Sequence, residues 1–322
     1  MTEQTKITAS GIQVLGVDAS VRSLRAAGQG PLKKGSFSYE YFPAKTEKGL
    51  KRLVETASSL SVQGPGFQSV TFGTSDDDQS AVFLTARTIE ALGATDVPTL
   101  SHLALAHETR RDIVAYIDAL AWNGARSFLA LRGDGDIKSP DESFASVVDL
   151  VETIDQRHGD QLSGGIGVAC YPETHPLAAS PEADLEALLD KQQAGATYAI
   201  GQFCFDAETW FGFVSRARAF GITMDLYPGI MPIHDLERLK TFAERCGSSV
   251  PEFVVDAFEC ATWQNPYDVA AGLLREQVTA LAEGGVDHIH IYTLNKAELA
   301  GIAAETFKEA VERRENSGRQ VA

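Results

Sequence analysis

Short apolar segments alternate with longer helix-like segments along most of this chain. Eight segments of five to seven residues are apolar throughout or alternate apolar with polar residues, as β-strands do, at residues 36–42, 68–72, 99–105, 127–131, 166–170, 199–203, 223–227 and 288–292. Apolar residues recur at helical spacing in the remaining segments, which predicts helices over 47–60, up to 92, 108–122, 142–157, 182–193, 207–220, 234–245, 267–283 and 296–314. The pattern therefore predicts a series of strand–helix units.

This series predicts a fold of the α/β class, a (β/α)8 TIM barrel in a single domain with a short N-terminal extension. Eight consecutive strand–helix units, with about 30 residues to a unit, bury their apolar faces when the strands close into a ring. A doubly wound open sheet is the competing fold, but it usually carries a G-x-G-x-x-G turn after an early strand. Gly28-Gln29-Gly30 is not such a turn, because no helix start follows it.

The predicted barrel occupies residues 35–314. Residues 1–34 are predicted to form the extension, with one short helix around 20–27, and residues 315–322 a polar, frayed tail. No apolar run approaches the roughly 20 residues that a membrane-spanning helix needs, and no apolar segment of the signal-peptide kind follows Met1. We therefore expect a cytoplasmic protein with no membrane partner.

The net charge limits the kinds of ligand that the protein can bind, and the cysteine spacing indicates the compartment. A formal net charge of −16 over 322 residues argues against a general nucleic-acid-binding protein, because phosphate contacts need a basic surface. Any anionic ligand must then find a local positive patch. The four cysteines are widely spaced and form no C-x-x-C motif, which favours free thiols in a reducing compartment.

Polar side chains stand where the predicted strands end, and in a TIM barrel these carboxyl ends carry the active site. They are Glu40, Thr71, His102, Arg132, Asp134, Tyr171, His175, Gln202 and Tyr292. Each of them also has a purely structural interpretation, such as a histidine that hydrogen-bonds a loop. Glu40 stands out, because Tyr39, Tyr41 and Phe42 flank it and desolvation favours the protonated carboxyl group that a general acid needs. No metal site is predicted, since the histidines lack an H-E-x-x-H or cysteine-rich context.

Taken together, the strand ends resemble one enzyme family. The motifs are F-S-Y-E-Y-F-P-A-K, S-V-T-F-G, L-R-G-D, Y-P-E-T-H-P, A-D-L-x-x-L-x-x-K-x-x-A-G-A, G-Q-F-C-F-D, P-G-I-M-P and Y-T-L-N-K. Their order and spacing are similar to those of methylenetetrahydrofolate reductases of the bacterial MetF type, and the resemblance covers residues 37–295.

The resemblance implies a TIM-barrel flavoenzyme that uses NADH or NADPH to reduce 5,10-methylenetetrahydrofolate to 5-methyltetrahydrofolate. FAD would lie across the mouth of the barrel. By this similarity the FAD-binding residues are Thr71, His102, Arg132, Gly133, Asp134, Tyr171, His175, Asp184 and Lys191. Arg132 and Lys191 could supply the local positive charge that a diphosphate needs in an acidic protein. The resemblance also implies a homo-oligomer, either a dimer or a tetramer.

The resemblance assigns catalysis to Glu40 and Asp134. Glu40 matches the general acid that protonates N10 of the folate and so opens the five-membered ring to the N5 iminium. Asp134 matches an aspartate near flavin and pterin, whose negative charge favours the cationic iminium. NADH and folate would use the same flavin face in turn, which gives ping-pong kinetics.

Three further residues are expected to bind the substrate. Gln202 matches a glutamine that hydrogen-bonds the pterin, and Phe242 an aromatic residue that stacks on the nicotinamide nucleotide or the folate. Lys296 stands where the family has the arginine of L-N-R; it keeps the charge but loses the bidentate geometry.

Other departures from the family pattern keep two alternatives open. Lys45 replaces the arginine of P-P-R, and Ala187 and Asp190 stand where bacterial relatives often carry asparagine and arginine. An aspartate near the FAD diphosphate would repel it, so the adenine side could be held differently. One alternative is therefore a flavin-free reductase that passes hydride directly from NADH to the folate. The other is a folate-binding or methyl-transfer barrel without redox activity.

Overall fold

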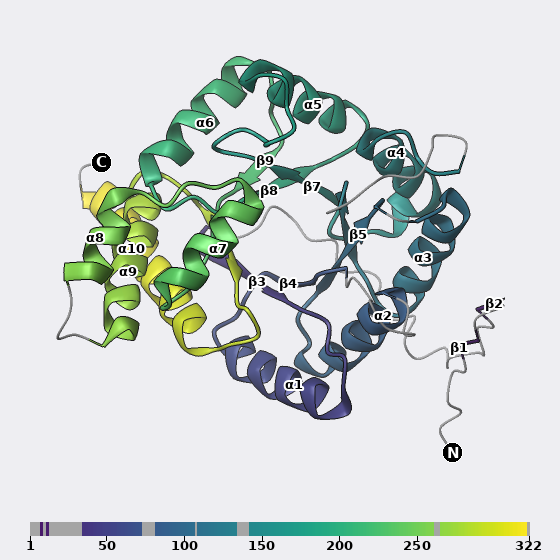
Figure 1. Cartoon of the computed structure of the whole chain (residues 1–322), viewed down its shortest axis with the longest axis horizontal. Helices are drawn as coiled ribbons and strands as arrows, with labels where there is room; N and C mark the ends of the chain where they lie inside the picture. The colour runs from purple at the N-terminus through teal and green to yellow at the C-terminus, as the bar shows by residue number, and fades with distance from the viewer. Residues whose placement is uncertain are drawn as a thin grey trace.

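The computed structural model describes residues 7–8, 11–12, 34–72, 81–106, 108–133, 142–260 and 265–320, without the side chains of 318–320. Figure 1 looks roughly along the axis of a barrel, whose strands lie inside a ring of helices. None of the described helices is long and apolar enough to cross a membrane. The helix expected around residues 20–27 lies outside the described residues, and the proposed domain boundaries stay predictions.

Parallel strands form one sheet in the order β10-β11-β3-β4-β5-β6-β7-β8-β9. Their bounds are β3 Ser36–Tyr41, β4 Phe67–Val70, β5 Thr99–Ala104, β6 Ser127–Leu131, β7 Ile166–Cys170, β8 Tyr198–Gly201, β9 Asp225–Tyr227, β10 Gly229–Ile230 and β11 His288–Tyr292. The two edge strands, β9 and β10, are separated in sequence by Pro228 alone, whose carbonyl accepts a hydrogen bond from His290 N–H at 2.9 Å. One segment, divided by a proline that lacks an N–H, thus closes the ring. The predicted (β/α)8 barrel is confirmed. In the extension, β1 (Ile7–Thr8) and β2 (Gly11–Ile12) form a small antiparallel pair.

The helices follow the predicted order. They are α1 Glu47–Ser61, α2 Ala81–Leu92, α3 Arg110–Trp122, α4 Val147–His158, α5 Pro181–Gln193, α6 Ala207–Ala219, α7 Leu236–Cys246, α8 Glu252–Cys260, α9 Pro266–Glu283 and α10 Glu298–Gln320. The predicted start of α4 at residue 142 is wrong, because Ser146 and Asp149 form a capping box that begins the helix at Val147. Helix α10 continues to Gln320, so the end predicted at residue 314 is also wrong.

The core divides into an outer layer, between strands and helices, and an inner layer inside the barrel. Tyr39 and Tyr41 of β3 belong to the outer layer, which contains most of the buried apolar side chains. A smaller apolar group, which includes Phe67, Leu100 and Tyr227, fills part of the barrel interior. Polar side chains from the paired strands β3 and β11 lie in another part of the interior, and Glu40 is one of them.

Candidate functional site

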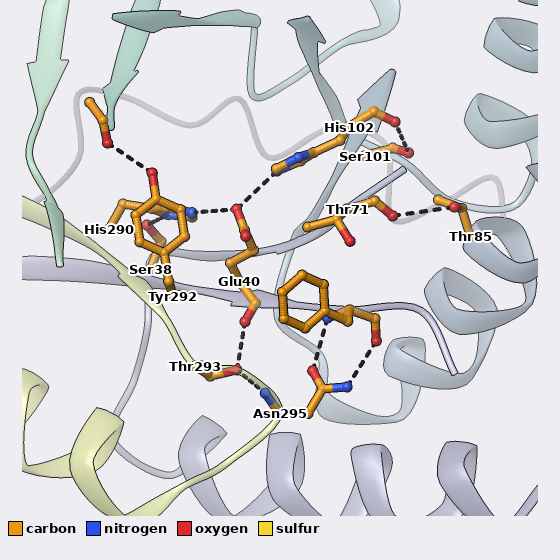
Figure 2. A network of polar contacts seen from close by, with 12 residues as sticks. Ser38, Glu40, Thr71, Thr85, Ser101, His102, His290, Tyr292, Thr293 and Asn295 are labelled. Carbon is orange, nitrogen blue, oxygen red and sulfur yellow. Dashed lines mark hydrogen bonds and ion pairs between the residues drawn. The ribbon is translucent and has the colours of Figure 1, made fainter. Parts of the chain in front are cut away.

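Glu40 lies inside the barrel near the carboxyl end of β3, and Figure 2 shows its carboxyl group between two histidine side chains. Its exposed fraction is only 9%. Successive side chains of a strand point to opposite faces, so Tyr39 and Tyr41 face the outer core and not Glu40. Phe42 is largely exposed. The burial of Glu40 is therefore confirmed, but the reason given from its neighbours in sequence was wrong.

The two histidines approach the same carboxylate oxygen. His102 Nε2 and His290 Nε2 each lie 3.3 Å from Glu40 Oε2. His290 is also fixed from its other side, because Ser38 Oγ lies 2.7 Å from His290 Nδ1. His102 Nε2 is buried and makes no hydrogen bond of good geometry within the described part of the chain. Burial lowers the pKa of His102 to about 4, although the charge of Glu40 opposes this, so the ring is neutral at neutral pH.

The turn after β11 fixes the strand end that carries Glu40. Thr293 Oγ1 donates a hydrogen bond of 2.6 Å to the Glu40 carbonyl. Asn295 accepts from Phe42 N–H at 2.9 Å and donates to the Phe42 carbonyl at 3.0 Å. Leu294 and Asn295 both have positive φ values, 51° and 56°, which this tight double contact requires. The T-L-N segment therefore positions the backbone around Glu40, as Figure 2 shows.

A second group, here called the basic cluster, lies at the ends of β6 and β7 and on α5. Its members are Arg132, Tyr171, His175, Asp184 and Lys191. The ring centroids of Tyr171 and His175 lie 4.4 Å apart in an edge-to-face arrangement. The backbone N–H of His175 donates a hydrogen bond to Asp184 Oδ2 at 3.0 Å. Burial lowers the pKa of His175; the charge of Asp184 raises it, and those of Lys191 and Arg132 lower it further. Four side chains predicted from three separate motifs thus share one electrostatic environment.

The donor set of the basic cluster fits an anionic group such as a diphosphate. Burial lowers the pKa of Lys191 while Asp184 raises it, so this amine lies in a desolvated setting with one carboxylate to balance it. Gly133 has a φ of 84°, and a Cβ there would lie 2.9 Å from Ala106 Cβ, so only glycine lets the backbone pass here. Asp190 is exposed on α5. Asp134 follows in the same segment but lies outside the described residues.

The remaining predicted residues lie in three places. Gln202 is half-buried after β8, where its Oε1 accepts from Phe203 N–H at 3.1 Å. Thr71 follows β4 and is held by its carbonyl, which accepts from Thr85 Oγ1 at 3.3 Å. Phe242 and Lys296 line a separate pocket of about 90 Å³ between α7 and the turn after β11. The structure thus brings Phe242 and Lys296 together, and their substrate-binding roles stay predictions.

Sequence reasoning missed His290, Ser38 and Arg238. The first two belong to an alternating pattern, S-x-S-x-E in β3 and H-x-H-x-Y in β11, that places polar side chains on one face of each strand. Arg238 lines the pocket of Phe242 and lies four residues before it on α7, so the helical period signals their shared face. Within the described residues, no group of histidine, cysteine or acidic side chains is arranged to hold a metal ion.

Comparisons with known proteins agree with this architecture. The family model described as methylenetetrahydrofolate reductase matches residues 26–306. The 5,10-methylenetetrahydrofolate reductase of Pectobacterium carotovorum is 34% identical over 277 residues, which cover 84% of this chain and 89% of that protein. The enzyme of the same name from Escherichia coli is 32% identical, with 84% and 90% covered. A probable methylenetetrahydrofolate reductase (NADH) from rice is 33% identical over 82% of this chain but 46% of its own length.

Solved structures agree in fold. A Clostridium thermocellum protein that binds two copies of 5-methyl-5,6,7,8-tetrahydrofolic acid superposes with a TM-score of 0.61 at 14% identity, covering 87% of this chain and 96% of that one. Yersinia pestis DHPS, solved with a pterine-sulfa conjugate, gives a TM-score of 0.52 at 12% identity, covering 88% and 95%. At these low identities the solved structures support the barrel fold alone. The family model and the bacterial relatives, in contrast, match this chain in sequence over most of its length. The chain belongs to the methylenetetrahydrofolate reductase family.

Proposed function

We propose that this protein reduces 5,10-methylenetetrahydrofolate to 5-methyltetrahydrofolate with electrons from NADH or NADPH that pass through FAD. The observation that carries the proposal is a buried carboxyl group, Glu40, held between His102 and His290 inside a barrel whose rim carries a basic cluster. The relatives' names include both NADH, in rice, and NADPH, in Caenorhabditis elegans, so they do not choose between the two nucleotides.

The proposed FAD site combines the basic cluster with its neighbours on the rim. Its members are Thr71, His102, Arg132, Gly133, Asp134, Tyr171, His175, Asp184 and Lys191. Arg132 and Lys191 would bind the diphosphate, because their positive charges offset the repulsion between an anionic ligand and a chain with a net charge of −16. When bound, FAD supplies the redox step, because it takes hydride from the nicotinamide nucleotide and gives it to the one-carbon unit.

Glu40 is the proposed general acid. The overall reaction consumes one proton for each molecule of NAD(P)H oxidised, and this proton must reach N10 of the folate. A protonated Glu40 would deliver it, which breaks the bond between N10 and the methylene carbon and leaves the N5 iminium. Asp134 would then favour the cationic iminium. His102 is neutral, so it does not supply a fixed positive charge that would hold Glu40 ionised.

The substrate would extend from Gln202 toward the pocket beside α7. Gln202 would hydrogen-bond the pterin, and Phe242 would stack on the aromatic part of folate or nucleotide. Lys296 and Arg238, both on that pocket, would attract the glutamate carboxylates of the folate. A homo-oligomeric state stays a prediction that rests on the family resemblance, and a cytoplasmic location one that rests on the sequence pattern and the cysteine spacing.

A visible absorption spectrum of the purified protein tests the proposal. We expect a flavin spectrum that bleaches with anaerobic NADH or NADPH and returns when methylenetetrahydrofolate is added. A colourless protein that reduces the folate with NADH would support the flavin-free reductase. A protein that binds folate but stays inactive with added FAD would be a non-redox barrel, and the proposal would be wrong.

A further inference from the structure

Polar side chains form a continuous column inside the barrel, along the contact between β3 and β11. The two strands pair in parallel, with His288 opposite Ser36 and His290 opposite Ser38. Because side chains alternate across a strand, Ser36, Ser38 and Glu40 share one face of β3. His288 and His290 share the facing side of β11. We call Ser36, His288, Ser38, His290 and Glu40 the polar column.

Each member of the polar column contacts the next. Ser36 Oγ lies 2.6 Å from His288 Nδ1, and His288 Nε2 lies 2.9 Å from Ser38 Oγ. Ser38 Oγ lies 2.7 Å from His290 Nδ1, and His290 Nε2 lies 3.3 Å from Glu40 Oε2. Both nitrogens of each imidazole are therefore used, one toward each end of the column.

This arrangement is unusual for the interior of a TIM barrel, where branched apolar side chains dominate. Ser38 and His290 are completely buried, and His288 has an exposed fraction of only 3%. Buried polar groups cost stability unless they are hydrogen-bonded, and replacing both partners with apolar groups of the same shape can be neutral or even stabilising. Stability alone therefore does not call for a polar pair here. Ser38 and His290 hold Glu40 in place, but His288 and Ser36 lie beyond that contact. The proposed function gives them no role.

The far end of the column leads toward solvent. Ser36 begins β3 and is only half-buried. The ring of Tyr227 lies 4.4 Å from that of His288, and Phe67 stacks on His288 at 5.4 Å. Both aromatic residues also line a pocket of about 350 Å³ at the end of the barrel opposite the site, where Asp225 is exposed. Water at this end therefore lies close to the column.

We infer that the polar column is a proton relay that reprotonates Glu40 from the far end of the barrel. With Glu40 ionised, Ser36 donates to His288 Nδ1, His288 Nε2–H to Ser38, Ser38 to His290 Nδ1, and His290 Nε2–H to Glu40. One proton enters from water at Ser36, each hydrogen bond passes one proton on, and one arrives at Glu40. Every donor then points the other way, and no member gains or loses net charge except Glu40. Before the next turnover both imidazole rings turn over and both hydroxyl groups rotate, which restores the starting direction.

The relay rests on the proposed function, in which Glu40 gives up one proton in each turnover. Flavin and folate would then cover the mouth of the barrel, whereas Ser36 at the far end of the column is only half-buried. His288 can pass protons on without retaining them, because its ring does not hold an extra proton. Burial lowers its pKa well below the usual value, and His290 lowers that pKa further. Phe67, Tyr227, Ser36, Ser38 and His290 are the groups that face its ring.

His288→Asn in the FAD-loaded enzyme tests the relay by rapid-quench measurement of methyl-folate formation. Asparagine stays polar but cannot pass a proton from one side of a ring to the other. In the proposed function Glu40 carries the transferred proton when a turnover begins, so we expect the first turnover at the wild-type rate. Later turnovers should be slower by about tenfold or more, with a larger solvent deuterium isotope effect. Ser36→Ala should show the same burst, and NADH–menadione activity should stay within about twofold of wild type in both variants.

Tyr227→Phe is the matched control, since it keeps the ring against His288 and loses only the hydroxyl that bonds Asp225 at 3.2 Å. We expect it to show no burst. The relay is wrong if His288→Asn and Ser36→Ala turn over at the wild-type rate, or if first and later turnovers slow equally, as general damage to the site would cause. If the proposed function itself fails, wild-type protein will make no methyl-folate at all, and the relay falls with it.

Discussion

Acid should destabilise this protein through His102, because a neutral imidazole is buried beside Glu40. Burial holds the pKa of His102 near 4, compared with 6.5 when the side chain is in water. As the pH falls below about 6.5, the unfolded chain therefore binds a proton that the folded protein does not. Stability is present above the unfolded value and is lost as the pH falls toward the folded value.

The size of the effect follows from the two pKa values. Proton linkage gives a loss of roughly 2 kcal/mol in the free energy of unfolding between about pH 7 and about pH 5. Buried His288 adds a loss of the same sign, so the wild-type decrease should exceed this amount.

Urea unfolding of wild type and His102→Leu at the two pH values, with excess FAD in every sample, isolates the contribution of His102. We expect the variant to lose roughly 2 kcal/mol less than wild type on acidification. Leucine removes no hydrogen bond of good geometry between described residues, and a loss of the proposed contact between His102 and FAD would lower the stability at both pH values. Equal acid losses in both proteins would show that His102 is not held neutral in the folded state, and would contradict the electrostatic account of the site.

Three more substitutions test the proposed ligand sites. Gly133→Ala should destabilise the protein by about 1–3 kcal/mol more than Gly64→Ala in urea unfolding. Both glycines have a positive φ, but only at Gly133 would the added Cβ lie against Ala106. Equal costs would refute the steric argument. Lys191→Met should weaken FAD binding by roughly 10–100-fold in a fluorescence titration, whereas Lys240→Met, an exposed control, should not. Lys296→Ala should raise KM for the folate with kcat nearly unchanged; a fall in kcat alone would argue against a binding role.

The barrel was predictable because its parallel strands are short, apolar and regularly spaced. Residues 127–131, 166–170 and 288–292 have the predicted bounds, since each apolar run ends where the chain turns into a loop. Helix α8 (Glu252–Cys260) was missed, because it is only nine residues long and Val254 is its one buried residue, too little for a clear helical period.

The residues of the proposed site came from the family motifs, whereas the contacts between them could not be predicted from the sequence. Family motifs named Glu40 and His102, but motif order cannot show that a strand distant in sequence supplies a second histidine to the same carboxylate oxygen. That histidine, His290, comes from a strand 250 residues away that pairs with β3 only because the barrel closes. The role of Tyr39 and Tyr41 was misjudged for a related reason, since residues adjacent in a strand face opposite sides.

The basic cluster shows what a resemblance adds to physical reasoning. Composition indicates only that an anionic ligand needs local positive charge. The structure then brings Arg132, His175 and Lys191 into one electrostatic environment. Without either the family motifs or the fold, no pattern in the sequence would have joined these three basic side chains from separate segments.

The most direct test of the account compares the two half-reactions in Glu40→Gln. Glutamine keeps the size of the side chain but has no acidic proton, so the folate half-reaction should slow by roughly 10²–10⁴-fold. Flavin reduction by NADH or NADPH, followed by stopped-flow absorbance, should stay within about twofold of wild type. Loss of both half-reactions would contradict Glu40 as a folate-specific acid, and folate reduction at the wild-type rate would remove the general acid from the mechanism.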